Sequence, residues 1–127
     1  MTDACSTTES AQRTLRRLYD DTDRRLDTLG DLRLDESTLE AQQAVFRALA
    51  NENRLQILEA LRQGELCACE LQVVLDAPQS TVATHLRELK DVGLVRTRRD
   101  GKWTYYRIAD TAALSIIDLA RAMGEDA

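Results

Sequence analysis

Residues 75–108, LDAPQSTVATHLRELKDVGLVRTRRDGKWTYYRI, contain the pattern that decides the fold. Residues 80–92 place Val82, Leu86 and Leu89 on one side of a helix, within about 60° of one another. Pro78 suits the beginning of this helix rather than its middle, and Gly93 is expected to end it. The stretch therefore begins with a turn and a short amphipathic helix.

The second half of the same stretch predicts a β-hairpin. Apolar and polar side chains alternate on both sides of Asp100-Gly101, a dipeptide typical of tight hairpin turns. We expect strands over about 94–99 and 103–108. The hairpin would carry a cluster of basic side chains around its turn.

Working outward, the spacing of apolar residues predicts five further helices. They are expected over 9–29, 38–50, about 52–62, about 65–75 and about 110–123. Ser37 with Glu40 is expected to form a capping box for the second of these helices, and Asn51 to cap the third.

These elements predict a mostly α-helical chain with a β-hairpin wing, which is a winged helix-turn-helix with an extra N-terminal helix. The predicted organisation is a flexible tail over 1–8, an N-terminal helix and link over 9–36, and the winged helix-turn-helix domain over 37–127. The chain of 127 residues is of the size of one domain, and a helical chain this short often enlarges its core by dimerising.

Composition excludes several classes of function. No apolar run approaches the roughly 20 residues that cross a bilayer, and the first ten residues are polar, so we expect a cytoplasmic protein without a membrane partner. The chain has one histidine, no glycine-rich phosphate loop and no nucleophile–base pair, which argues against an enzyme.

The charge distribution indicates contact with nucleic acid. The net charge is −5, yet residues 79–107 carry seven basic and three acidic side chains, a local charge of +4. Such a basic stripe is what phosphate contact requires. The outer face of the helix over 80–92 has small hydroxyl groups and an arginine, which suits a helix that enters the major groove. The predicted DNA-binding residues are Gln79, Ser80, Thr81, Thr84, His85, Arg87, Arg96, Arg98, Arg99 and Lys102.

Cys67 and Cys69 in GELCACELQVVL, residues 64–75, are the candidate metal ligands. Positions i and i+2 of a regular helix lie about 200° apart, so both thiols converge only if Cys67 lies in or just before the first turn. Two thiolates are too few for a closed site, and Cys5 is the third candidate ligand. Three sulfurs suit As(III) or Sb(III), and Pb(II) could accept them.

Two alternatives stay open for these cysteines. Zn(II) or Cd(II) would prefer a fourth ligand, which Glu65, Glu70 or water could supply. The same thiols could instead form a redox switch, although a disulfide between Cys67 and Cys69 would close a strained ring. A small buried apolar role also suits cysteine, but not two cysteines in three residues of one regular helix.

Four segments in this order resemble the ArsR/SmtB family of metal-responsive winged-helix repressors. They are FRALANENRLQILEAL, ELCACEL, LDAPQSTVATHLRELKDVGLV and RRDGKWTYYRI, and the likeness covers about residues 40–110. The resemblance implies that Cys67 and Cys69 hold the inducer. The third cysteine that arsenite-responsive members carry three residues further on is replaced by Gln72, whereas an N-terminal extension with Cys5 is present.

The resemblance implies a homodimeric repressor that binds double-stranded operator DNA and releases it when a thiophilic metal or metalloid binds. Arsenite or antimonite is the favoured inducer, and cadmium, lead or zinc is the alternative. The implied dimer interface lies on the helices over 38–50 and 110–123, and the latter would be a C-terminal dimerisation helix. The interface residues are Leu39, Phe46, Leu49, Leu114 and Ile117. The family's second metal site needs histidine on the last helix, which this chain lacks. No further protein partner is implied.

Overall fold

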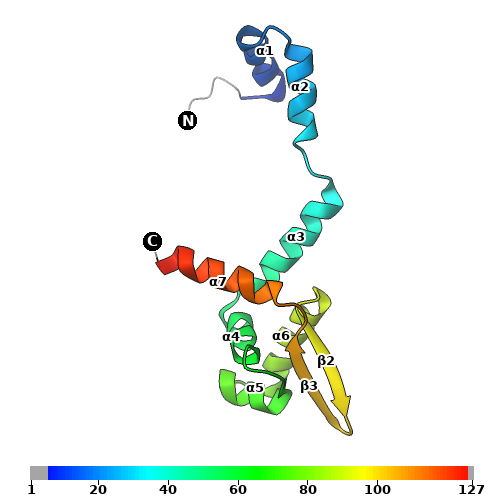
Figure 1. The fold of residues 1–127 in the computed structure, drawn as a ribbon, viewed down its shortest axis with the longest axis vertical. Coiled ribbons are helices and arrows are strands. Elements are labelled where there is room, and N and C mark those ends of the chain that lie inside the picture. The colour runs from blue at the N-terminus through cyan, green and yellow to red at the C-terminus, as the bar shows by residue number, and fades with distance from the viewer. Residues whose placement is uncertain (1–5, 126–127) are drawn as a thin grey trace. The chain divides into compact units, whose positions relative to one another are not determined.

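The computed structural model describes residues 6–125. Its elements, all but β1 labelled in Figure 1, are α1 (Thr8–Leu18), α2 (Thr22–Asp31), α3 (Glu36–Leu49), α4 (Glu52–Leu61), β1 (Leu66–Cys67), α5 (Ala68–Leu75), α6 (Gln79–Asp91), β2 (Val95–Asp100), β3 (Trp103–Ile108) and α7 (Ala112–Glu125). The chain forms two compact units, residues 1–39 and residues 40–127, whose described parts are 6–39 and 40–125.

The first unit corrects the prediction of one helix over 9–29, because the chain breaks into α1 and α2. Tyr19 has extended backbone, with φ −124° and ψ 137°, and ends α1. The Asp21 carboxylate accepts a hydrogen bond from the Arg24 N–H at 3.2 Å and so caps α2. The Thr22 hydroxyl donates to the Tyr19 carbonyl at 3.1 Å. Aspartate and threonine bind nearby backbone groups in competition with a continuous helix, which the spacing of leucines did not reveal.

The start of α3 also differs from the prediction. Asp35, not Ser37, caps this helix: its carboxylate accepts hydrogen bonds from the Thr38 N–H at 2.8 Å and from the Ser37 hydroxyl at 3.0 Å. The hydrogen bonds from Thr38 and then Ser37 lower the pKa of Asp35. The predicted cap of α4 is confirmed, because the Asn51 side chain accepts from the Arg54 N–H at 3.1 Å.

The second unit has one apolar core, to which helices α3 to α7 and the sheet all contribute. Its buried side chains are Ala48, Leu49, Ile57, Leu58, Leu61, Leu71, Val82, Leu86, Leu89, Leu94, Val95, Ala113 and Ile117. The residues predicted to form the inner face of α6 are therefore buried. No polar or charged residue within 6–125 is buried, so the side chains that fill this core are all apolar.

A three-stranded antiparallel sheet flanks the core, with strand order β1-β3-β2. The predicted hairpin is confirmed as β2 and β3 (Figure 1). Asp100 pairs with Trp103, so the turn consists of Gly101 and Lys102 rather than Asp100-Gly101. Gly101 has a φ of +61°, a conformation that favours glycine and explains its place at the first turn position.

The third strand, β1, corrects the prediction of a helix over 65–75. Leu66 pairs with Tyr106 and Cys67 with Tyr105, and α5 begins only at Ala68. Pairing with the edge of β3 holds Leu66 and Cys67 in an extended conformation. This pairing joins residues far apart in the sequence, so local sequence patterns could not reveal it. The elements α5 and α6 and the turn between them, followed by the β2–β3 wing, make a winged helix-turn-helix, as predicted.

Candidate metal and nucleic-acid sites

The backbone at the cysteines allows both thiols to serve one site. Cys67 has extended backbone, with φ −86° and ψ 167°, and is the N-cap of α5, whereas Cys69 lies in the first turn of that helix. The 200° separation expected of a regular helix therefore does not apply, which confirms the condition set by the sequence. The Glu70 carboxylate accepts a hydrogen bond from the Cys67 N–H at 2.9 Å and fixes the helix start.

Both cysteines line one pocket of about 310 Å³. The pocket joins three elements, because its walls come from the start of α5, from α6 and from the wing. They are formed by Cys67, Ala68, Cys69, Gln79, Ala83, Leu86, Lys102, Trp103, Thr104 and Tyr106. A group held by the two sulfurs would thus lie beside α6 and the wing turn. Sequence reasoning missed the pocket role of Trp103, since it is set by the pairing of β1 with β3.

The described residues supply two sulfurs and no complete metal site. Within 6–125, no group of three or more His, Cys, Asp or Glu side chains is placed to hold a metal ion. Glu65 and Glu70, the candidates for a fourth ligand, are engaged by Arg98 and by the Cys67 N–H. Cys5 lies outside the described residues. The donor set fits a soft ion that completes its coordination with a further thiolate or an exogenous ligand.

The outer face of α6 is open to solvent at most of the predicted DNA-binding positions. Gln79, Ser80, Thr84 and Arg87 are exposed, and Thr81 is half-buried. The Thr84 hydroxyl donates to the Ser80 carbonyl at 2.9 Å, which leaves its oxygen as an acceptor for DNA. This face is therefore polar and small, as a helix that enters the major groove requires.

His85 lies on the other side of the same helix, half-buried against α4. Its Nδ1 is 3.3 Å from Nη1 of Arg54, and its Nε2 is 3.3 Å from the Asn53 amide. The Arg54 guanidinium can only donate, so Nδ1 is the acceptor in this contact. Arg54 also donates to the Ala48 carbonyl at 2.6 Å. Through its contacts with Ala48 and His85, it connects the end of α3 to α6.

Burial lowers the pKa of His85 below its ordinary value of 6.5, the charge of Arg54 lowers it further, and Glu88 opposes the shift. Between the folded pKa and 6.5 the unfolded chain binds a proton that the folded chain does not. We therefore expect the free energy of unfolding to fall as the pH decreases from 7 through this window. Urea unfolding at pH 7.0, 6.0 and 5.5, compared with His85→Gln, checks this.

His85 is the single histidine of the chain, so its replacement should flatten the dependence on pH above 5.5. The ion-paired Glu65, whose pKa is lowered mainly by hydrogen bonding to Arg98, and the capping Asp35 give a separate loss of stability only at lower pH. An equally steep slope in His85→Gln between pH 7.0 and 5.5 would contradict the assignment.

The wing presents its basic side chains in two different ways. Arg96, Arg99 and Lys102 are exposed, and the ammonium of Lys102 lies 5.6 Å from the centroid of the Trp103 ring. Arg98 instead makes three contacts with the Glu65 carboxylate, at 3.0 to 3.1 Å. Sequence reasoning missed this ion pair, because the two residues are 33 positions apart.

The residues predicted for the dimer interface divide into exposed and buried sets. Leu39 and Phe46 are 48% and 61% exposed, whereas Leu49 and Ile117 belong to the chain's own core and Leu114 is half-buried. An apolar groove of about 200 Å³ runs between α3 and α7, lined by Phe46, Leu49, Ala50, Leu55, Ile116, Ile117 and Ala120. Leu119 and Met123 on α7 are also exposed and lie four residues apart, but they were not among the predicted interface residues.

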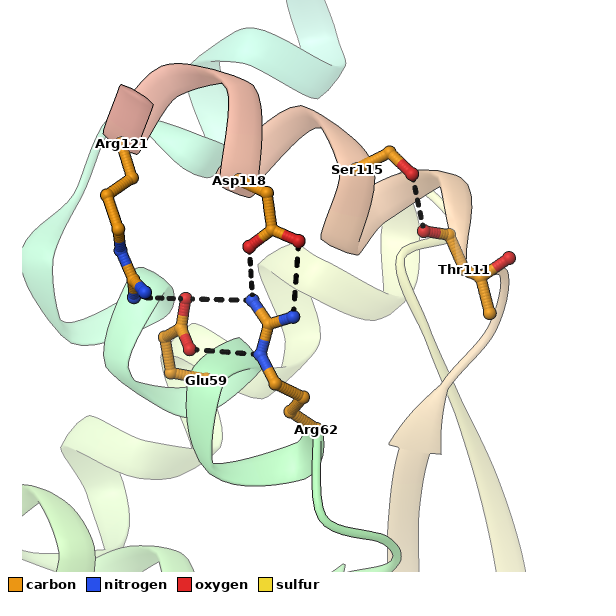
Figure 2. A network of polar contacts seen from close by, with 6 residues as sticks. All are labelled: Glu59, Arg62, Thr111, Ser115, Asp118 and Arg121. Atoms are coloured by element: carbon orange, nitrogen blue, oxygen red, sulfur yellow. Dashed lines mark hydrogen bonds and ion pairs between the residues drawn. The ribbon is translucent and has the colours of Figure 1, made fainter. Parts of the chain in front are cut away.

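A network of ion pairs fixes α7 to α4 (Figure 2). The Arg62 guanidinium contacts Asp118 at 2.8 Å and Glu59 at 3.1 Å, and Arg121 contacts the same Glu59 at 3.0 Å. Hydrogen bonds to Glu59 and then Asp118 raise the pKa of Arg62. The helix that carries Leu119 and Met123 is thereby held in a defined orientation on the domain.

No helix within residues 6–125 is long and apolar enough to cross a membrane.

Comparison with known proteins agrees with this architecture. The family model described as "Bacterial regulatory protein, arsR family" matches residues 51–97. A cadmium resistance transcriptional regulatory protein of Listeria innocua is 40% identical over 75 residues, which are 58% of this chain and 63% of that protein. The arsenical resistance operon repressor of Escherichia coli K12 is 42% identical over 66 residues, which are 51% of this chain and 56% of that protein. The chain thus spans less than two thirds of these curated relatives.

A solved structure is similar to this chain over a longer stretch than the curated relatives are. The homodimeric winged helix-turn-helix DNA-binding domain of a possible ArsR-family regulator from Mycobacterium bovis has a TM-score of 0.66 and 34% identity. The alignment covers 71% of this chain and 83% of that one. Fold and site together define a winged helix-turn-helix regulator, a class of DNA-binding proteins and not of enzymes. Within that class, the chain belongs to the arsR family of bacterial regulatory proteins.

Proposed function

We propose that this chain is a homodimeric transcriptional repressor that binds operator DNA and releases it when a thiophilic metal or metalloid binds at Cys67 and Cys69. The observation that carries the proposal is the shared pocket: two thiols, the start of α6 and the wing turn line one cavity. Chemistry at the sulfurs would therefore act directly on the surfaces that face DNA.

The DNA-binding part of the proposal rests on the α6 face and the wing. Gln79, Ser80, Thr81, Thr84 and Arg87 would contact bases or phosphates in the major groove. Arg96, Arg99 and Lys102 would contact neighbouring phosphates, since they are exposed around the wing turn. His85 remains a predicted contact only at the edge of this surface, because its ring faces α4.

The dimer would form through α3 and α7. Phe46, Leu119 and Met123 expose large apolar surfaces beside the apolar groove, which a second copy of the chain would cover. Leu39 would extend the same contact along α3, and the buried Leu49 and Ile117 would support it from beneath. The half-buried Leu114 lines a different pocket, beside Leu61 and Gly64. Two copies would present two α6 helices to a two-fold symmetric site, about one helical turn apart.

The inducer would be a soft ion, with arsenite or antimonite favoured and cadmium, lead or zinc as the alternative. Two thiolates within three residues select soft ions, and Cys5 is the remaining thiol that could complete a trigonal set. The relatives include both a cadmium-resistance regulator and an arsenical-resistance repressor, which fits a thiolate site without deciding the ion.

The chain's own residues suggest how occupancy would reach the DNA. Cys67 is at once the last residue of β1, paired with Tyr105 of β3, and the N-cap of α5. Drawing its sulfur toward Cys69 would pull on the β1–β3 pairing and on the Glu70 hydrogen bond that fixes the start of α5. Both changes would alter the position of α6 relative to the wing.

The proposal is tested by fluorescence anisotropy with DNA from upstream of the chain's own gene, with a scrambled duplex as control. We expect specific binding whose affinity falls steeply with salt, and release on titration with one of arsenite, antimonite, cadmium, lead or zinc. Equal binding to the scrambled duplex would overturn the DNA-binding proposal. Release by mild oxidant, with none of the five ions effective, would favour a redox sensor that uses the same thiols.

A further inference from the structure

Arg98 differs from the other basic residues around the wing turn because two of its guanidinium nitrogens, Nε and Nη2, are hydrogen-bonded to a carboxylate, although its side chain is 49% exposed. Nε donates to both Glu65 oxygens at 3.1 Å, and Nη2 donates to Oε1 at 3.0 Å. The guanidinium carbon lies 4.8 Å from the centroid of the Tyr105 ring, within the range of a cation–π interaction. Glu65, Arg98 and Tyr105 thus form a three-residue cluster, called the clasp below.

The clasp spans all three strands of the sheet next to a candidate ligand. Tyr105 of β3 pairs with Cys67 of β1 on one side and with Arg98 of β2 on the other. Residues opposite one another in antiparallel strands lie on the same face of a sheet, so these three form one row. Glu65 is two residues before Cys67, and its ion pair connects the chain leading into β1 to β2 across β3.

The Glu65 carboxylate and the Arg98 guanidinium have opposite charges, and the carboxylate occupies two of the three guanidinium nitrogens. Arg99, the next residue, is exposed, and within 6–125 it forms no ion pair. A phosphate contact through Nε or Nη2 of Arg98 would require breaking its hydrogen bonds to Glu65, whereas Arg99 would break none.

We propose that the clasp is the link between the thiols and the wing, and that Arg98 is a positioning residue rather than a phosphate contact. The inference rests on the proposed function. β1 has only two residues, so its pairing with β3 is weak by itself. The clasp ties the same segment to β2, and a displacement of Cys67 is thereby passed to the strand that leads to Arg99 and the wing turn.

Four variants of the clasp test this link, and Arg99→Gln is the matched control. Operator affinity is measured with and without the ion that releases the unaltered chain, and each affinity is measured at several salt concentrations. The release ratio is the operator affinity without the ion divided by the affinity with it. We expect Glu65→Gln and Arg98→Gln each to reduce this release ratio at least threefold. The double variant should reduce it no further than either single variant, because both remove the same contact.

The salt dependence separates positioning from phosphate contact. Arg98→Lys keeps the positive charge but loses the planar fork that binds a carboxylate through two donors. We expect it to reduce the release ratio as Arg98→Gln does, and both variants to keep the salt slope of the unaltered chain. Arg99→Gln should keep the release ratio and lower the slope by about one.

Two results would overturn the inference while leaving the proposed function intact. One is a full release ratio in Glu65→Gln, and the other is a salt slope lowered by about one in Arg98→Gln. If the unaltered chain does not bind its upstream DNA, or if none of the five ions releases it from that DNA, the proposed function itself fails and not the clasp alone. Melting temperatures of all variants exclude unfolding as the cause.

Discussion

Cys67→Ser is expected to keep binding operator DNA and to remain bound when the inducing ion is added. Serine preserves the size of the side chain and can cap α5, so the path from β1 to α6 should stay in place. The hydroxyl is a poor ligand for soft ions, so the site loses one of two described sulfurs. Coupling between sites is typically about 1–3 kcal/mol, so a release of roughly 5- to 150-fold should fall to nearly none.

Anisotropy titrations of Cys67→Ser, Cys69→Ser and Cys5→Ser, with the unaltered chain beside them, make the comparison. The two variants in the pocket should behave alike. Cys5→Ser distinguishes a three-thiolate site, which loses its response to arsenite, from a two-thiolate site, which keeps it. Normal release by Cys67→Ser would remove this thiol from the mechanism.

Leu71→Ala is expected to cause the largest loss of stability among single changes near the site. Leu71 is 0% exposed and is the buried residue of α5, the helix that begins at the cysteines. Its truncation removes apolar contacts and leaves a cavity, at a cost of about 2–5 kcal/mol. Val73 lies on the same helix but is 82% exposed, so Val73→Ala should change the free energy of unfolding by no more than about 0.5 kcal/mol.

Urea unfolding followed by circular dichroism measures both changes, at one fixed protein concentration because dimerisation would add to stability. The two variants test whether α5 is held in place by one face only. A loss of stability in Val73→Ala equal to that in Leu71→Ala would mean that the exposed face of α5 is covered in solution.

The second unit could be predicted from sequence because local and long-range preferences agree there. The apolar spacing of α6 matches its buried face, Asn51 caps α4, and a glycine occupies the hairpin turn where φ is positive. Helix 9–29 was predicted wrongly because its leucines have helical spacing while Asp21 and Thr22 interrupt the backbone. Neither α1 nor α2 has a buried residue that would have outweighed this local effect.

The candidate site was predictable in composition but not in its connections. The sequence identified Cys67 and Cys69 as candidate ligands, provided that Cys67 lies in or just before the first turn of a helix. Only the pairing of β1 with β3 shows how the two thiols come to line one pocket. The ion pair of Arg98 with Glu65 and the inward position of His85 depend on contacts between residues more than 30 positions apart. Sequence patterns of charge place all such side chains on the surface without distinguishing free groups from engaged ones.

The central claim is that soft-ion binding at the cysteines and operator binding at α6 and the wing are coupled. The most direct test is the dissociation constant of the inducing ion, measured by competition with a chelator or dithiol, for the free protein and for the operator complex. Coupling free energies are reciprocal, so the operator should weaken ion binding by the factor by which the ion weakens operator binding. Identical ion affinities in the free protein and the complex would contradict the account.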